Sequence, residues 1–129
     1  TLAALDKLQG LPEEQKQEAY YLRGLCSTRL GGMTGEGVHW RAAISTFTEA
    51  EELGLKTATL YENWSTAYKG SSNYIRAAQC LRRAYEVEPT AERCARAVEA
   101  YLEANPQSQE AEELRKECGI RFGSDPGGE

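Results

Sequence analysis

The chain resembles itself when it is shifted by 34 residues along its own length. Five positions then pair with a residue of similar size, in the order aromatic, small, bulky apolar, small, bulky apolar. The pairs are Trp40 with Tyr74, Ala43 with Ala77, Phe47 with Leu81, Ala50 with Ala84, and Leu53 with Val87. Within each copy the positions are three or four residues apart, which is the spacing of one helix face. The repeat therefore predicts two similar amphipathic helices.

A second correspondence precedes the first, at a different shift. EAYYLRGLCSTRLG matches TLYENWSTAYKGSS, with Tyr20 on Tyr61, Gly24 on Ser65 and Thr28 on Lys69, each 41 residues apart. The two shifts differ by seven residues, which must lie between the two helices of the first copy. The glycine-rich stretch LGGMTGEGVHW, residues 30–40, is the place for them. We therefore expect residues 31–39 to form an expanded turn between two helices.

Signals that end helices divide the chain into six expected helices. These signals are Gly54, Pro89 and the pair Asn105 and Pro106, and Asn73 is an N-cap candidate after a short turn. The expected helices lie near 18–30, 39–53, 58–70, 73–88, 91–104 and 107–118. A further helix is expected at residues 1–11 because Leu2, Leu5, Leu8 and Leu11 follow one another every three residues. The C-terminal GSDPGGE is expected to be disordered.

Residues 58–91 resemble a tetratricopeptide repeat (TPR), a helix-turn-helix unit of 34 residues. The matching signature positions are Tyr61, Trp64, Ser65, Tyr68, Ala77, Leu81, Ala84 and Pro89. Residues 17–57 resemble a second copy, in which Leu55 replaces the terminal proline, and residues 92–118 resemble a degenerate third copy. The resemblance implies an all-α, TPR-like α-solenoid of about three helix-turn-helix units. The whole chain, 1–129, is then a single domain with an N-terminal helix at 1–16 and a tail at 119–129.

The resemblance also implies where such a domain binds a partner. The first helix of each unit faces a concave surface that suits an extended peptide or a partner helix. The candidate peptide-binding residues are Tyr21, Leu25, Arg29, Glu62, Asn63, Thr66, Lys69, Arg93 and Arg96. Some TPR proteins bind a C-terminal carboxylate through a clamp of Lys, Asn and Arg, but Tyr21 and Leu25 replace two of its members here. We expect a short linear peptide with an acidic portion or a free C-terminus, held by the basic residues.

Charge and cysteine usage narrow the class of protein further. The net charge of −5 argues against nucleic acid and anionic lipid as partners, and no apolar run approaches the roughly 20 residues that span a membrane. Cys26, Cys80, Cys94 and Cys118 are 54, 14 and 24 residues apart, without a close CxxC pair. We therefore expect reduced, packed thiols and a cytoplasmic location.

The glycine-rich stretch allows two structural readings and carries no recognisable chemistry. It has neither the Lys-Ser/Thr pair of a phosphate-binding P-loop nor a preceding strand, and His39 is the only histidine in the chain. The stretch is therefore expected either to tolerate an insertion or to make a partner-specific contact. No convergent set of catalytic residues is recognisable, so we expect no enzyme activity, no metal and no cofactor.

Three functional hypotheses follow. The first is an interaction module that captures a peptide or helix of a partner protein on the concave face. The second is a structural or oligomerising scaffold element, which stacks on further repeats or on another copy, with capping on the C-terminal side only. The third is an adaptor that positions a chaperone or an enzyme.

Overall fold

A computed structural model describes residues 12–123 of the chain, and within that range it contains six helices and no strand. The helices are α2 (Glu13–Thr34), α3 (Gly37–Glu52), α4 (Ala58–Gly70), α5 (Tyr74–Val87), α6 (Ala91–Ala104) and α7 (Gln109–Phe122). The all-α prediction is confirmed. The helix predicted for 1–11 lies outside the described residues, as do positions 124–129 of the predicted tail.

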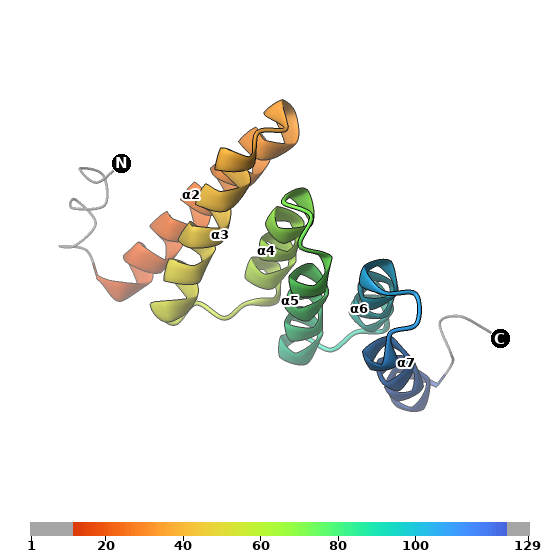
Figure 1. Ribbon diagram of the computed structural model, residues 1–129. Coiled ribbons are helices and arrows are strands. Elements are labelled where there is room, and N and C mark those ends of the chain that lie inside the picture. The colour runs from red at the N-terminus through yellow and green to blue at the C-terminus, as the bar shows by residue number, and fades with distance from the viewer. Residues whose placement is uncertain (1–11, 124–129) are drawn as a thin grey trace.

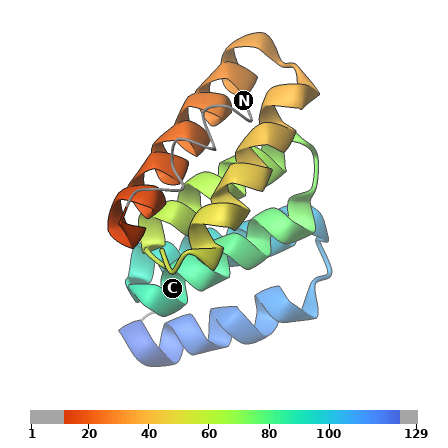
Figure 2. The same ribbon diagram turned by 90° about the vertical axis from the view of Figure 1, so that its left-hand side faces the viewer.

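Successive helices pair into three hairpins that follow one another from one end of the molecule to the other. Each helix contacts the next one along the chain, and α2 also contacts α4. The hairpin of α2 and α3 lies at one end of the molecule and α7 lies at the other (Figures 1 and 2). Because every connection is short, most contacts between helices join helices that follow one another in the sequence.

Four helices begin at a polar side chain that caps them. Thr57, Asn73, Thr90 and Ser108 each accept a hydrogen bond from the backbone N–H three residues further on. Such a cap satisfies one of the amide groups that a helix start leaves without a partner. The prediction of Asn73 as an N-cap is confirmed.

Two clusters of buried side chains form the core. The first lies among α2, α3, α4 and α5 and is built around Phe47, Leu60 and Trp64. The second lies among α5, α6 and α7 and is built around Tyr85 and Leu114. The small residues that repeat at a shift of 34, Ala43, Ala50, Ala77 and Ala84, are all buried. Small side chains at these positions let neighbouring helices approach closely.

The expanded turn predicted for residues 31–39 is wrong, because most of this stretch is helical. Residues 31–34 belong to α2, residues 37–39 belong to α3, and only Gly35 and Glu36 lie between them. Under the shifts that align the first two hairpins, α2 ends five residues later than α4, α3 begins three residues earlier than α5, and the turn between them is one residue shorter. Seven residues are close to two turns of helix, so the hairpin grows by about one turn on each side.

The glycines within helices α2 and α4 make room for aromatic rings from α3. A Cβ on Gly31 would lie 2.6 Å from the indole of Trp40, and a Cβ on Gly70 would overlap the same ring from α4. Gly24 stands against the buried ring of Phe47 in the same way. The glycines therefore allow close packing of the rings, and Trp40 of α3 contacts both α2 and α4.

The prediction of four reduced thiols is wrong for one pair. Cys94 of α6 and Cys118 of α7 form a disulfide with a Cα to Cα distance of 5.9 Å. Of the free cysteines, Cys80 is buried, as expected, but Cys26 is exposed. Disulfides persist in oxidising compartments, so the cysteines no longer support a cytoplasmic location. None of the described helices combines the length and the apolar character needed to cross a membrane.

The C-terminal helix extends further than the sequence indicates. α7 runs to Phe122, into the segment predicted as a tail, because the ring of Phe122 packs edge-on against Tyr85 at a centroid distance of 6.2 Å. At the other end, α2 begins at Glu13, so residues 13–16 are continuous with the first repeat helix.

Candidate functional site

The nine predicted peptide-binding residues lie on three helices, and direct contacts link those helices. Tyr21, Leu25 and Arg29 are on α2, Glu62, Asn63, Thr66 and Lys69 are on α4, and Arg93 and Arg96 are on α6. We call the surface that carries these nine residues the α2/α4/α6 face. Asn63 Nδ2 donates to Tyr21 Oη at 3.1 Å, and Arg93 Nε donates to Glu62 Oε2 at 3.0 Å. The structure therefore brings these parts of the predicted site together.

The remaining members of the prediction are less connected. Leu25 packs against the first core cluster, which leaves only part of its side chain for a partner. The hydroxyl of Thr66 donates to the carbonyl of Glu62 in its own helix. Arg29 is exposed, and its guanidinium makes no hydrogen bond or ion pair within residues 12–123.

Most cations of the α2/α4/α6 face are already paired with carboxylates. Arg93 contacts Glu88 as well as Glu62, at 3.1 Å, and its side chain is only 21% exposed. Arg96 contacts Glu92 at 3.0 Å, and Lys69 contacts Glu103 of α6 at 3.4 Å. An incoming carboxylate would have to share or replace these contacts, so the three cations are not free for a ligand.

A surface cavity of about 560 Å³ opens on this face beside Tyr21. We call it the carboxylate cavity, and it is lined by Glu14, Gln17, Glu18, Tyr21, Leu22, Leu55, Thr57, Thr59 and Glu88. Three carboxylates and no lysine or arginine line it, and Leu22 is 51% exposed within it. Sequence analysis found Tyr21 but missed Glu14 and Leu22. The signal available was a pattern of carboxylates and apolar residues on the first three turns of one helix.

Tyr21 is a neutral hydrogen-bonding group at the edge of the carboxylate cavity. Burial raises the pKa of Tyr21 above its usual value of 10.0. Since its oxygen accepts from Asn63, its own O–H remains able to donate. The cavity therefore offers an apolar wall, the phenol donor of Tyr21 beside the hydroxyls of Thr57 and Thr59, and negative charge.

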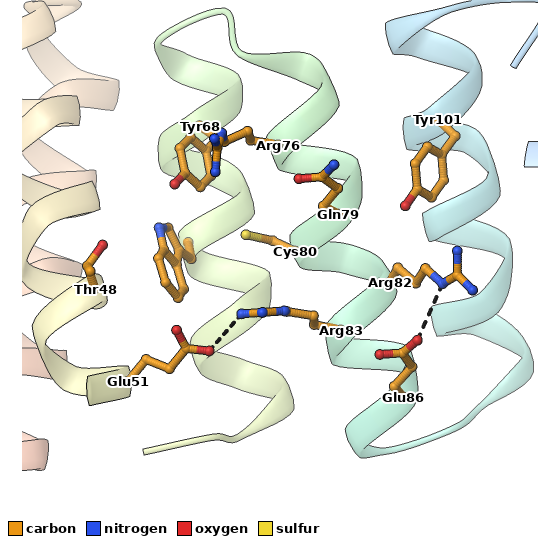
Figure 3. A pocket seen from close by; sticks show the side chains of 11 residues that line it. Thr48, Glu51, Tyr68, Arg76, Gln79, Cys80, Arg82, Arg83, Glu86 and Tyr101 are labelled. Atoms are coloured by element: carbon orange, nitrogen blue, oxygen red, sulfur yellow. Dashed lines mark hydrogen bonds and ion pairs between the residues drawn. The ribbon is translucent and has the colours of Figure 1, made fainter. Parts of the chain in front are cut away.

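A second cavity, of about 580 Å³, lies among α3, α4, α5 and α6 (Figure 3). We call it the arginine groove, and it is lined by Thr48, Glu51, Trp64, Tyr68, Arg76, Gln79, Cys80, Arg82, Arg83, Glu86 and Tyr101. Sequence analysis did not identify it. The available signal was three arginines on one helix, with Arg76 and Arg83 seven residues apart and therefore on the same side.

Two of the three arginines in this groove are held in place by neighbours. Arg83 Nη1 donates to Glu51 Oε2 at 2.7 Å, and its guanidinium lies 5.6 Å from the ring centroid of Tyr61. Arg82 contacts Glu86 at 3.3 Å (Figure 3). Such contacts restrict the side chains before any ligand arrives.

Two titratable groups near the arginine groove, the Cys80 thiol and the Tyr61 phenol, stay protonated well above neutral pH because they are buried. Burial raises the pKa of the Cys80 thiol to about 12. Burial, together with the hydrogen bond to Glu51, raises the pKa of Tyr61 to about 12. Since a thiolate is the nucleophilic form of cysteine, Cys80 is unreactive at neutral pH. Cysteine chemistry is therefore not expected in this groove.

The part of the chain that the structure describes contains no group of side chains arranged to hold a metal ion. No three histidine, cysteine or carboxylate side chains gather there at ligand distance. His39 contacts Glu36 at 3.4 Å in the first turn of α3, where it pairs with a single carboxylate. The predicted absence of enzyme activity remains a prediction.

Comparisons with known proteins leave these sites to physical argument. No family model matches the chain, and no curated protein matches it. The residues that line the two cavities, their charges and their burial therefore carry the functional interpretation.

Proposed function

We propose that the chain is a protein-interaction module of the TPR type, an α-solenoid whose α2/α4/α6 face binds a segment of a partner protein. The repeat at shifts of 34 and 41 residues supports this proposal, as do the three consecutive helical hairpins. Successive hairpins of this kind expose one helix of each pair on a common face, which suits an extended or helical ligand.

The carboxylate cavity is the observation that carries the proposal. Leu22 is half exposed beside Tyr21, and the carboxylates of Glu14 and Glu18 make no ion pair within residues 12–123. An apolar side chain of a ligand covers the leucine, and a lysine or arginine next to it pairs with the carboxylates. The partner segment is therefore apolar and basic.

The sequence-based preference for an acidic or C-terminal segment rested on Lys69, Arg93 and Arg96 as available cations. Each of these lies within ion-pair distance of a glutamate. An acidic segment would have to displace a carboxylate that is already in place, at a cost in desolvation and rearrangement. We therefore assign a basic segment to this face, and the acidic version remains a prediction.

Titration of a synthetic peptide tests the assignment. The probe is a short capped peptide with one leucine flanked by two arginines, and its control carries two glutamates in their place. Calorimetry should detect binding of the basic peptide, weakened about tenfold by Glu18→Lys, because the variant puts a positive charge into the cavity. Glu99→Lys makes the same charge change on α6 outside the cavity and should leave the affinity unchanged. Equal binding of both peptides, or equal weakening by both variants, would contradict the assignment.

A scaffold role is the second candidate, and exposed apolar side chains at the ends of the molecule favour it. Ile120 on α7 is 86% exposed, and Met33 near the end of α2 is 76% exposed. Large apolar groups in water are typical of surfaces that another chain covers. Sedimentation velocity over a range of concentrations tests this role, since Ile120→Asp should shift an associating chain towards monomer. The adaptor hypothesis remains a prediction.

A further inference from the structure

We propose that the arginine groove binds an acidic segment of a second partner protein, on a surface separate from the α2/α4/α6 face. The groove carries three arginines and two glutamates, whereas the whole chain has a net charge of −5. A local excess of positive charge on an acidic protein directs an acidic ligand to that place. None of the nine residues of the α2/α4/α6 face lines this groove.

Arg76 is the cation that a ligand can reach first. Its guanidinium makes no hydrogen bond or ion pair within residues 12–123, and the residue is exposed. In Figure 3 its side chain extends from α5 towards Tyr68 of α4. A carboxylate can therefore pair with Arg76 without displacing a group of the protein, and its two oxygens match the two parallel N–H groups of a guanidinium.

Arg83 provides a second anchor at a defined distance. It lies seven residues after Arg76 on α5, so the two Cα atoms are about 10 Å apart along the helix axis. An extended chain of the polyproline II type rises about 3.1 Å per residue with three residues per turn, so carboxylates three residues apart lie on one side of it and match this separation. Arg83 uses Nη1 for Glu51 and stays 54% exposed, which leaves further N–H groups for a ligand.

The floor of the groove supplies apolar surface and one unused donor. Trp64 stacks on Tyr68 at a centroid distance of 6.1 Å, and both residues line the groove. Trp64 is 6% exposed, and its Nε1 is the buried side-chain polar atom without a hydrogen bond in the described part of the chain. A buried donor without an acceptor is uncommon, and this N–H is the one buried side-chain donor of the described residues that keeps its hydrogen-bonding capacity.

The arrangement favours a peptide over a nucleic acid. Nucleic acids need a run of cations that follows successive phosphates, and Glu51 and Glu86 interrupt the run of arginines in this groove. The amide of Gln79, which lies between Arg76 and Arg83 on α5, suits a peptide backbone. An extended segment with two carboxylates three positions apart and an apolar side chain near them fits all of these groups.

Titration with paired peptides tests the proposal on the full chain. The probe is a short capped peptide with two glutamates three positions apart and one leucine, and its control has glutamines in their place. The glutamate peptide should bind, and Arg76→Glu should weaken it about tenfold because a paired charge is lost and a like charge introduced. Arg41→Glu, the same change on an exposed part of α3 outside the groove, should leave the affinity unchanged. Arg83→Gln should weaken binding as well, and Arg76→Gln should do so with less risk to folding because this side chain has no hydrogen bond or ion pair within residues 12–123.

A nuclear magnetic resonance signal locates the peptide independently of affinity. Trp40 and Trp64 are the two tryptophans of the chain, so their indole N–H signals can be assigned and followed during the titration. The signal of Trp64 should shift and that of Trp40 should not. Equal binding of the glutamine peptide, equal weakening by Arg76→Glu and Arg41→Glu, or a shift confined to Trp40 would overturn the proposal. Binding of a single-stranded oligonucleotide in place of the peptide would overturn it as well.

The two binding proposals fail separately. Glu18→Lys should weaken the basic peptide and leave the acidic one unaffected, and Arg76→Glu should do the reverse. Loss of both interactions in either variant would show a general effect of charge and contradict both proposals.

Discussion

The two ends of the molecule are held together by different means. At the N-terminal end, the rings of Trp40 and Phe47 fill spaces that glycines leave open on neighbouring helices. At the C-terminal end, the disulfide between Cys94 and Cys118 joins α6 to α7. The packing of rings against glycines does not change with the redox environment, whereas a disulfide is broken by reductant. The stability of one end should therefore respond to reductant and that of the other should not.

Truncation of Phe47 should have the largest effect, because this ring is fully buried at the centre of the first cluster. Phe47→Ala removes a large apolar group and leaves a cavity, which lowers the free energy of unfolding by about 3–5 kcal/mol. Urea denaturation monitored by circular dichroism measures the loss, and it should be the same with and without reductant. Val38→Ala, on the exposed side of the same helix, should change stability by less than about 0.5 kcal/mol. If Phe47→Ala lowered the free energy of unfolding only in the presence of reductant, the two ends of the molecule would not be stabilised independently.

Removal of the disulfide should have the next largest effect. Cys94 and Cys118 close a loop with a sequence separation of 24, so loss of the bond should cost about 3 kcal/mol through the unfolded state. The double variant Cys94→Ala and Cys118→Ala should unfold at lower urea concentration than the parent chain, and reductant should no longer change its midpoint. Cys26→Ala, at an exposed free thiol, should keep the sensitivity of the parent to reductant. An unchanged midpoint in the double variant would show that α6 and α7 are held by packing alone.

Alkaline pH should have the smallest effect and should act on both ends alike. Burial raises the pKa of Tyr61 to about 12, and burial also raises the pKa of Tyr85 beside α7. The neutral phenol of Tyr61 therefore stabilises the fold below its usual pKa of 10.0, and this contribution is lost as the pH rises from there through about 12. Tyr61→Phe and Tyr85→Phe should each reduce the loss of thermal stability between pH 9 and pH 11.

Measurements at pH 7 provide the reference for this prediction, because neither phenol ionises there. Each variant also loses a hydrogen bond to a glutamate, Glu51 for Tyr61 and Glu117 for Tyr85, which lowers stability at every pH. Only the slope against pH is therefore informative. A slope unchanged in both variants would contradict the role of the buried phenols, and a change in one alone would show that pH, like reductant, separates the two ends.

The α2/α4/α6 face and the arginine groove show what sequence reasoning could anticipate about the arrangement of residues and what it could not. The resemblance to the tetratricopeptide repeat implies one face that carries Tyr21, Asn63, Arg93 and Lys69. In the structure Asn63 contacts Tyr21, Arg93 contacts Glu62, and Lys69 contacts Glu103 of α6. The pairing of the cations on this face could not be predicted from the sequence. Their partners Glu88 and Glu103 are not among the nine residues expected on the face, and they contact Arg93 and Lys69 only in the folded chain. Ion pairs depend on which distant side chains lie within a few ångströms, and periodicity carries no such information.

The sequence by itself determined the helical class, the repeat and most helix boundaries, because a helix is made from contacts within four residues and its caps are local. Asn73 illustrates this, since its capping role follows from the residues beside it. The tertiary structure decided that residues 31–34 and 37–39 are helical, since Trp40 needs the glycines opposite it. It also decided which cysteines pair and where the arginines gather. These outcomes depend on how separate helices pack, which becomes defined only when the chain is folded.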